Sequence, residues 1–111
     1  MADLVQVISQ PGPFTVSAKA MIESDGPAIV TLAGSVWAIT PNNLIGISLA
    51  IDGAQAATAQ IFANPASTHL AVVPVSFSYT FTIGEHSFEL NALTGETTSD
   101  FNDFYVVTVQ Y

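Results

Sequence analysis

Residues 75–83 read Val75-Ser76-Phe77-Ser78-Tyr79-Thr80-Phe81-Thr82-Ile83. Every odd position is apolar, and every even position carries a hydroxyl group. Because side chains of an extended strand point alternately to its two faces, this period of two predicts a strand with one face buried and the other in water. A helix, at 3.6 residues per turn, could not place these apolar residues on one side. The stretch therefore predicts a β fold.

The same alternation recurs along the chain, and no stretch has the spacing of an amphipathic helix. The Ala-rich residues 54–63 are the one place where a helix could intrude, but Asp52-Gly53 just before them is a strong signal for a two-residue hairpin. We therefore predict about eight strands, at residues 4–8, 14–22, 28–39, 44–51, 54–62, 69–83, 86–93 and 104–111.

Turn-forming residues separate these strands, and a long polar stretch at 94–103 precedes the last one. Short strands at regular spacing predict an all-β, two-sheet antiparallel sandwich, for which a jelly roll is the natural eight-strand arrangement. Pro74 interrupts an otherwise good strand and cannot donate a ladder hydrogen bond, so we expect a bulge or an edge there. With no repeat or linker, residues 1–111 are expected to form a single domain.

The charge balance excludes several classes of partner. The chain has nine Asp and Glu residues against a single Lys or Arg, a formal net charge of −8. Binding to a nucleic-acid backbone normally uses clustered Lys and Arg, so nucleic acid and anionic lipid are poor partners. No apolar run approaches the roughly 18 residues of a membrane-spanning helix. The absence of cysteine excludes disulfides and thiolate metal sites.

A shortage of charge predicts association between copies of the chain. Only 9% of the residues are charged and 50% are hydrophobic, whereas an ordinary domain has about 25% charged residues. Residues 28–39 and 104–111 also carry apolar side chains on both faces, which implies that something covers the second face. We expect a homo-oligomer, with interface candidates Trp37, Phe104, Tyr105, Val106, Val107, Val109 and Tyr111. Trp37 and Ile39 could instead be tolerated surface residues.

Three segments resemble the tumour-necrosis-factor-like and complement-type jelly rolls, a group that includes small relatives on bacterial and phage surfaces. They are Ile47-Ser48-Leu49-Ala50-Ile51-Asp52-Gly53, Ile83-Gly84-Glu85-His86-Ser87-Phe88-Glu89-Leu90, and Asp103-Phe104-Tyr105-Val106-Val107-Thr108-Val109. The resemblance implies a homotrimer with the last strand in the sheet nearest the threefold axis. It also implies a non-enzymatic protein that displays its loops multivalently. No family receptor-contact or calcium motif is matched.

Alternating strand directions would place four connections, at 9–13, 40–43, 63–68 and 94–103, at one end of the sandwich. Recognition commonly resides in loops at one end of a rigid sandwich. The polar side chains there lack Lys and Arg and suit the hydroxyl groups of sugars, although polar loops are also polar simply because they are wet. The predicted ligand-binding residues are Asn42, Asn43, Asn64, Ser67, Thr68, His69, Glu96, Thr98 and Asn102. Trp37 could stack on a sugar ring, or serve as core or interface.

A calcium site is a second hypothesis for the same loops. Calcium takes six to eight oxygen ligands that include carboxylates. The candidate ligands are Glu96, Asp100, Asn102 and Asp103. Asp and Asn before a strand also commonly bond their own backbone, so a purely structural turn is the alternative. No other cofactor is expected.

No catalytic motif is present: His69 and His86 do not have the H-E-x-x-H spacing, and neither a G-x-S-x-G elbow nor a phosphate-binding loop occurs. We expect a non-enzymatic protein, although a triad need not be local in sequence. We expect a recognition module that binds carbohydrate or a cell-surface receptor through the loops at one end of the sandwich. The main alternative is a structural subunit of a virion or particle surface. The start, Met1-Ala2-Asp3-Leu4, lacks the features of a signal peptide, so the compartment stays open.

Overall fold

The computed structural model describes residues 3–111, so Met1 and Ala2, on which the expectation about a signal peptide partly rests, lie outside it. The described residues form strands and contain no helix, hence no helix that could cross a membrane. The body measures 43 × 22 × 21 Å. Its strands are β1 (Leu4–Pro11), β2 (Val16–Ile22), β3 (Gly26–Ala38), β4 (Asn43–Ile51), β5 (Ala54–Ala63), β6 (Leu70–Ala71), β7 (Val75–Phe81), β8 (Gly84–Ala92), β9 (Thr97–Thr98) and β10 (Phe104–Gln110).

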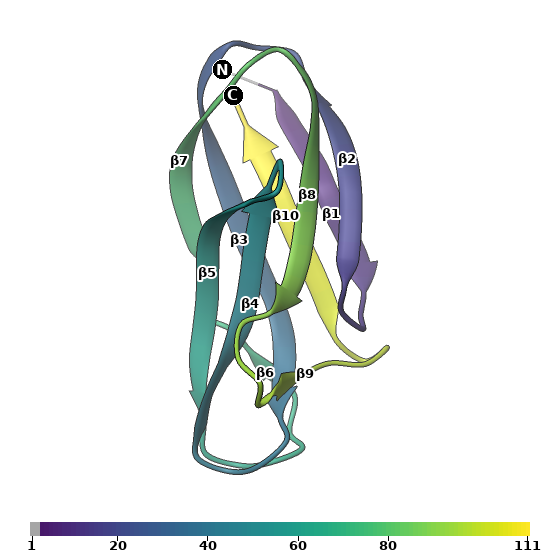
Figure 1. Ribbon diagram of the computed structural model, residues 1–111, viewed down its shortest axis with the longest axis vertical. Coiled ribbons are helices and arrows are strands. Elements are labelled where there is room, and N and C mark those ends of the chain that lie inside the picture. Colours follow the sequence, from purple (N-terminus) through teal and green to yellow (C-terminus); the bar gives the residue numbers. More distant parts are fainter. Residues whose placement is uncertain (1–2) are drawn as a thin grey trace.

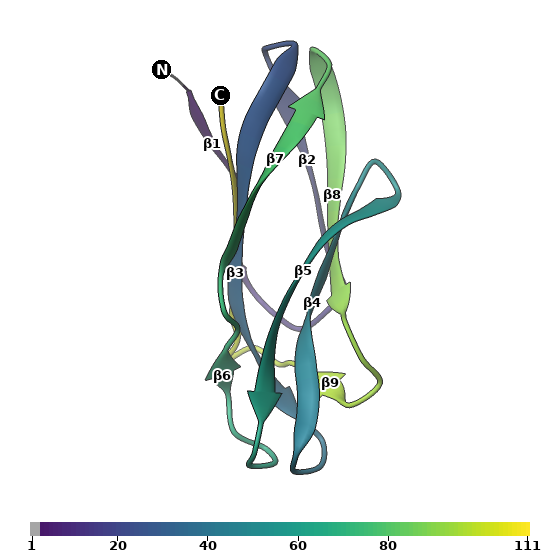
Figure 2. The ribbon, with the colours of Figure 1, turned by 90° about the vertical axis from the view of Figure 1, so that its left-hand side faces the viewer.

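The strands form two antiparallel sheets that face each other (Figure 2). One sheet has the order β1-β10-β3-β6, with β7 and β9 also paired to β3. The other has the order β2-β8-β4-β5. Consecutive long strands mostly lie in different sheets, which is the jelly-roll arrangement of a sandwich. The predicted fold class is confirmed.

The predicted strands are present, with one interruption and one addition. The expected strand at 69–83 is divided at residues 72–74 into β6 and β7, which pair with different parts of β3. Pro74 ends the pairing there, because it has no N–H group to donate. The two-residue strand β9 inside the polar stretch 94–103 was not predicted. Residues 54–63 form β5, so the Ala-rich segment is a strand and not a helix.

The hairpin at Asp52-Gly53 is confirmed. Asp52 has φ 51° and Gly53 has φ 85°, as a two-residue turn with positive φ at both central positions requires. Asp tolerates this left-handed conformation better than most residues, and Gly adopts it freely. The turn joins β4 to β5, which pair from Ile51 opposite Ala54 to Asn43 opposite Ala63, with a shift in register between Leu49 and Ala50.

The core lies between the sheets, and in β10 the alternation of the strand decides which side chains enter it. In β10 the buried residues are Tyr105, Val107 and Val109, whereas Phe104 is exposed and Val106 is half-buried. The other large, fully buried side chains are Ile8, Ile22, Val30, Leu32, Ile45, Ile47, Leu49, Ile51, Phe81, Phe88 and Leu90.

The expected convergence of four connections is confirmed (Figure 1). The segments between β1 and β2, β3 and β4, β5 and β6, and β8 and β10 all lie in the half of the molecule opposite the chain termini, with those between β3 and β4 and between β5 and β6 at its tip; we call this the loop end. Backbone hydrogen bonds join these segments across the two sheets. Asn42 N lies 3.1 Å from Asn64 O, Ile39 N lies 3.0 Å from Glu96 O, and Gly12 N lies 2.9 Å from Asp103 O.

Candidate functional site

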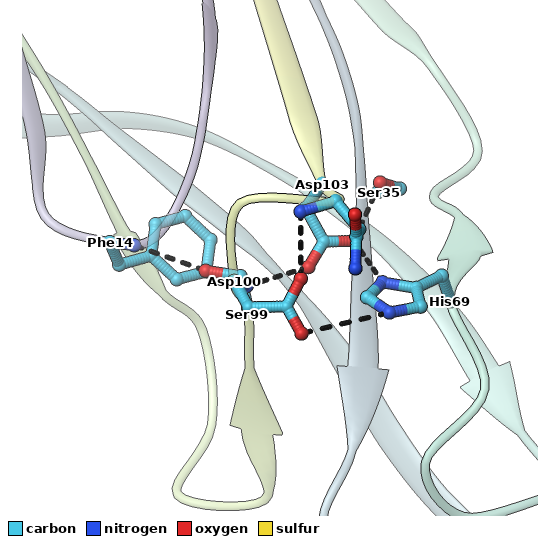
Figure 3. Close-up of polar contacts among 7 residues, drawn as sticks. Phe14, Ser35, His69, Ser99, Asp100 and Asp103 are labelled. Carbon is cyan, nitrogen blue, oxygen red and sulfur yellow. Dashed lines mark hydrogen bonds and ion pairs between the residues drawn. The ribbon is translucent and has the colours of Figure 1, made fainter.

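A buried carboxylate organises one side of the loop end (Figure 3). Asp103 precedes β10, and its side chain is inaccessible to solvent. Its Oδ1 atom accepts a hydrogen bond from Ser35 Oγ at 2.7 Å and lies 2.7 Å from His69 Nδ1. Its Oδ2 atom accepts the backbone N–H of Asp100 at 2.9 Å. A buried carboxylate is costly unless it is paired and hydrogen-bonded, and these donors satisfy it.

Three separate segments deliver the groups of this cluster. Ser35 lies on β3, His69 lies directly before β6, and Asp100 and Asp103 lie in the connection before β10. Ser99 Oγ accepts the backbone N–H of Phe14 at 3.0 Å, which ties the β1–β2 connection to the same loop. The polar stretch 94–103 is therefore held to both sheets.

The cluster favours a protonated imidazole at His69. The hydrogen bond with Asp103 raises the pKa of His69, assisted by the charges of Asp103 and Asp100 and opposed by partial desolvation. Its Nε2 atom lies 3.8 Å from Asp100 Oδ2. The imidazolium therefore donates through Nδ1 to Asp103, and its positive charge offsets part of the negative charge of the two carboxylates.

Glu96 belongs to a second, separate network. Its Oε1 atom accepts a hydrogen bond from Thr40 Oγ1 at 2.6 Å and a longer one from Asn43 Nδ2 at 3.4 Å. Asn43 Nδ2 also lies 2.7 Å from Thr40 Oγ1 and 3.1 Å from Thr40 O. The amide donors of Asn43 are thus directed within the protein and stabilise the connection between β3 and β4.

The other predicted ligand-binding residues are distributed around these networks. Asn42 and Asn64 meet through their backbones, and Ser67 N donates to Ala38 O at 2.9 Å. Thr68 Oγ1 donates to Ala66 O at 3.2 Å, and Thr98 pairs with Trp37 at β9. The nine residues all lie at the loop end, but the structure divides them between the His69 cluster, the Glu96 network and the surrounding turns.

The predicted calcium ligands do not form one set. Among the described residues, the group whose potential ligand atoms lie within 4.8 Å of one another is His69, Asp100 and Asp103; Glu96 is not part of it. Asn102 contributes its backbone N–H to Asp100 Oδ1 at 2.8 Å. Calcium prefers oxygen ligands, and an imidazole nitrogen suits transition metals better. The Asp103 oxygens already serve protein donors, so a purely structural role accounts for them.

The structure places the predicted interface residues in several different surroundings. Tyr105, Val107 and Val109 are buried within the single chain, so they cannot contact another subunit without opening the core. The hydroxyl group of Tyr111 accepts the backbone N–H of Glu23 at 3.1 Å, which gives this residue an intrachain role. Phe104 and Val106 point away from the core. Trp37 lies edge-on to His69, with ring centroids 6.2 Å apart, and so borders the candidate site.

The arrangement of Ser35, Asp103 and His69 is not that of a nucleophile and its base. In a catalytic triad the imidazole lies between the serine and the carboxylate. Here the carboxylate lies between the other two, because Ser35 Oγ and His69 Nδ1 both contact Asp103 Oδ1. The hydroxyl group of Ser35 donates to the carboxylate and not to an imidazole. Sequence analysis had not singled out Ser35 or Thr40, since neither residue lies in a recognisable motif.

No protein-family model and no curated protein matches the sequence. Solved structures with the same fold include the globular domain of zebrafish complement 1qA (TM-score 0.53, 14% identity, 84% of this chain and 66% of that one). Murine APRIL, a tumour-necrosis-factor-family protein, gives a TM-score of 0.55 at 8% identity, with 100% of both chains covered. The C-terminal domain of EclA, described as a sugar-binding protein, gives 0.52 at 14% identity, covering 98% and 78%.

These similarities show the fold and confirm the predicted resemblance to tumour-necrosis-factor-like and complement-type jelly rolls. In two further matching structures, this chain spans only 12% and 18% of the length of the matched chain. The same fold therefore occurs both as a separate domain and as part of much longer chains.

Proposed function

We propose that this protein is a non-enzymatic recognition module that binds neutral carbohydrate through its loop end. The observation that carries the proposal is the convergence there of four connections with side chains that donate and accept hydrogen bonds. The chain's one basic residue other than histidine, Lys19, lies on β2 and not in these connections. Neutral sugars are recognised by such hydroxyl, amide and carboxylate groups without a need for Lys or Arg. The sugar-binding description of the EclA domain supports this use of the fold.

We further propose that the protein is a homotrimer that associates through the outward face of the β1-β10-β3-β7 layer. The outward side chains of β10, β3 and β7 in this layer are uncharged. They are Phe104, Val106, Thr108 and Gln110 on β10, Ile29, Thr31 and Ala33 on β3, and Ser76, Ser78 and Thr80 on β7. A charge-depleted face with exposed Phe104 and Ile29 resembles the composition of subunit interfaces. Three copies would present three loop ends, so that weak sites act together.

A glycan array tests the binding proposal. The purified protein should bind at least one class of neutral glycan, and a variant in which Asn42 and Asn64 are both replaced by Ala should lose part of that signal. Lys19→Ala is the matched control, since it lies away from the loop end. No binding to any glycan, in the presence and absence of calcium, would contradict the proposal.

Light scattering tests the assembly proposal, because a trimer has three times the 11.6 kDa mass of the chain. A monodisperse 11.6 kDa species at high concentration would overturn it. The same uncharged face also supports the alternative of a structural subunit on a virion or particle surface. Co-purification with a particle and no glycan binding would favour that alternative over the recognition module.

A further inference from the structure

A cleft of about 480 Å³ lies beside the loop end, where strands β4 and β5 of the four-stranded sheet meet the β6–β7 connection and the start of β7. Its lining residues are Leu44 on β4, Thr58, Gln60, Ile61 and Phe62 on β5, Val73 in the β6–β7 connection, and Val75 at the start of β7. Its volume falls within the range of small-molecule sites, about 300–1,000 Å³. No motif or turn signal in the sequence indicates this region.

Hydrogen bonds and strand register hold the walls of the cleft in place. Leu44 and Phe62 are partners across β4 and β5. The backbone N–H of Val73 donates to Gln60 O at 3.1 Å, which fixes the β6–β7 connection against the edge of β5 (Figure 2). The carbonyl of Leu44 accepts a hydrogen bond from Thr94 Oγ1 at 3.0 Å. The cleft is therefore continuous with the connections that form the loop end.

Large apolar side chains at this cleft are exposed to solvent, although side chains of this kind are usually buried in a folded protein. Phe62 is 54% exposed, Val73 is 59% exposed and Leu44 is 43% exposed. The alternation of β5 would have allowed a polar residue at position 62 without cost to the core. Adjacent apolar side chains on an otherwise polar surface commonly mark a binding site.

Resting on the proposed function, we infer that this cleft binds one ring of a neutral sugar, with Phe62 as the stacking surface. A pyranose ring has one face formed mainly by C–H groups, and the negative face of an aromatic ring attracts their slight positive charge. The side chains of Gln60 and Thr58 supply amide and hydroxyl groups for the ring hydroxyls. No lining residue is charged, so the cleft complements a neutral ligand, and the net charge of −8 disfavours an anionic one.

The position of the cleft explains how it could act together with the loop end. Asn43 directly precedes Leu44, and Asn64 follows Phe62 by two residues. A sugar ring on Phe62 would therefore lie next to the loops, and a second ring of the same glycan would extend toward them. This assigns the apolar contact to Phe62, where sequence analysis had considered Trp37.

The test is a titration of the ¹⁵N-labelled protein with neutral disaccharides, for which maltose, cellobiose and lactose are the probes, followed by NMR. We expect the amide signals of residues 58–62 and 73–75 to shift in a saturable manner with at least one probe. Phe62→Ala should weaken that binding about tenfold, and Phe62→Tyr should retain it. Phe101→Ala is the matched control, because Phe101 is also highly exposed but lies in the loop before β10.

The outcomes separate this inference from the proposed function. Shifts confined to residues 94–103, or a loss of binding in Phe101→Ala but not in Phe62→Ala, would overturn the role of the cleft and leave the recognition module standing. If the amide signals of residues 58–62 shift only when the protein is diluted, the cleft is a contact between copies of the chain. That result also overturns the inference. No shift with any sugar, combined with an empty glycan array, would overturn both.

Discussion

His86 Nδ1 lies 2.6 Å from Asp52 Oδ2, and this contact joins the β4–β5 hairpin to the start of β8. The other ring nitrogen, Nε2, lies 2.7 Å from Thr82 O. Asp52 Oδ1 in turn accepts the backbone N–H of Ser87 at 2.9 Å. Both imidazole nitrogens therefore face acceptors, which favours the protonated ring. The ring is largely buried and lies edge-on to Phe81, at a centroid distance of 5.0 Å.

This pair makes the stability of the protein depend on pH. The hydrogen bond with Asp52 is the largest cause that raises the pKa of His86 above its ordinary 6.5, and the hydrogen bond with the carbonyl of Thr82 adds to it. Burial of the ring opposes this rise. Its contribution is therefore complete below pH 6.5 and is lost as the pH rises through the higher folded pKa. Burial would raise the pKa of Asp52, but the bonds from His86 and Ser87 outweigh it and lower the pKa below 3.8. Its contribution is lost as the pH falls through that lower value.

We expect maximal stability from this pair between about pH 4 and pH 6.5, and a decline toward alkaline pH. Asp52→Asn should lower the free energy of unfolding by about 1–2 kcal/mol at pH 5.5, and by less at pH 9. Urea unfolding at the two pH values measures this difference. His69 has a raised pKa as well, so the stability of the Asp52→Asn variant should still depend in part on pH. An equal loss at both pH values would contradict the role of the charged pair.

The two faces of β10 should respond differently to a new charge. Val107→Asp would bury an unpaired carboxylate in the core and cost several kcal/mol, enough to unfold the domain or cause aggregation. Val106→Asp would place the charge on the outward face, where the fold tolerates it but the proposed trimer does not. Circular dichroism and light scattering should show a folded protein of lower mass for Val106→Asp. A folded Val107→Asp variant would contradict the assignment of the two faces.

Removal of the buried carboxylate should disorder the loop end. Asp103→Ala leaves Ser35 Oγ and the Asp100 N–H without their acceptor, and we expect a loss of about 3 kcal/mol in stability. Hydrogen exchange should accelerate at residues 99–103. Asp100→Asn is the control, because Asp100 is partly exposed and surface pairs contribute at most about 1 kcal/mol. Equal effects of the two substitutions would show that Asp103 is not the organising group.

A glycine in β3 marks a close contact between the sheets. A Cβ atom at Gly34 would lie 2.7 Å from Tyr105 Cδ1 and 2.9 Å from Ile47 Cδ1. Gly34→Ala should therefore destabilise the protein by about 1–3 kcal/mol through overpacking. Gly95→Ala, where no atom lies within 4 Å of the added Cβ, should have little effect. Thermal unfolding of the two variants compares them directly, and an unchanged Tm for Gly34→Ala would contradict the tight contact.

Calcium should not stabilise the protein, because the Asp103 oxygens bind protein donors and Glu96 belongs to a different network. We expect the same Tm in millimolar calcium and in EDTA. A rise in Tm with calcium that Asp100→Asn abolishes and Glu96→Gln does not would instead support a site at the His69 cluster. A rise abolished by both substitutions would restore the ligand set predicted from the sequence.

Much of the fold could be predicted because its signals are local. The alternation at residues 75–83 and the Asp52-Gly53 turn each specify their own structure within a few residues, and both are present as expected. An irregularity at Pro74 was predicted as a bulge or an edge within one strand at 69–83, but the structure divides that strand into β6 and β7. The short strand β9 was missed, because two residues carry no periodicity and pair only where β3 happens to pass.

The candidate site could be predicted in location but not in detail. The alternating strand directions bring the polar connections to one end, and the order of strands along the chain is enough to show this. The contacts of Asp103 with Ser35 and His69 span 68 and 34 residues. No local pattern indicates which of several nearby carboxylates, Glu96, Asp100 or Asp103, those partners will meet.

The sequence by itself determined an all-β sandwich with polar loops at one end and no basic surface, because strand periodicity, turn chemistry and charge are properties of neighbouring residues. Only the tertiary structure decided that Tyr105, Val107 and Val109 face the core, that Phe104 and Val106 face outward, and that Phe62 remains exposed at a cleft. When the side chains on both faces of a strand are apolar, the alternation shows which residues share a face. It does not show which face packs against the other sheet. That choice depends on the packing of one sheet against the other.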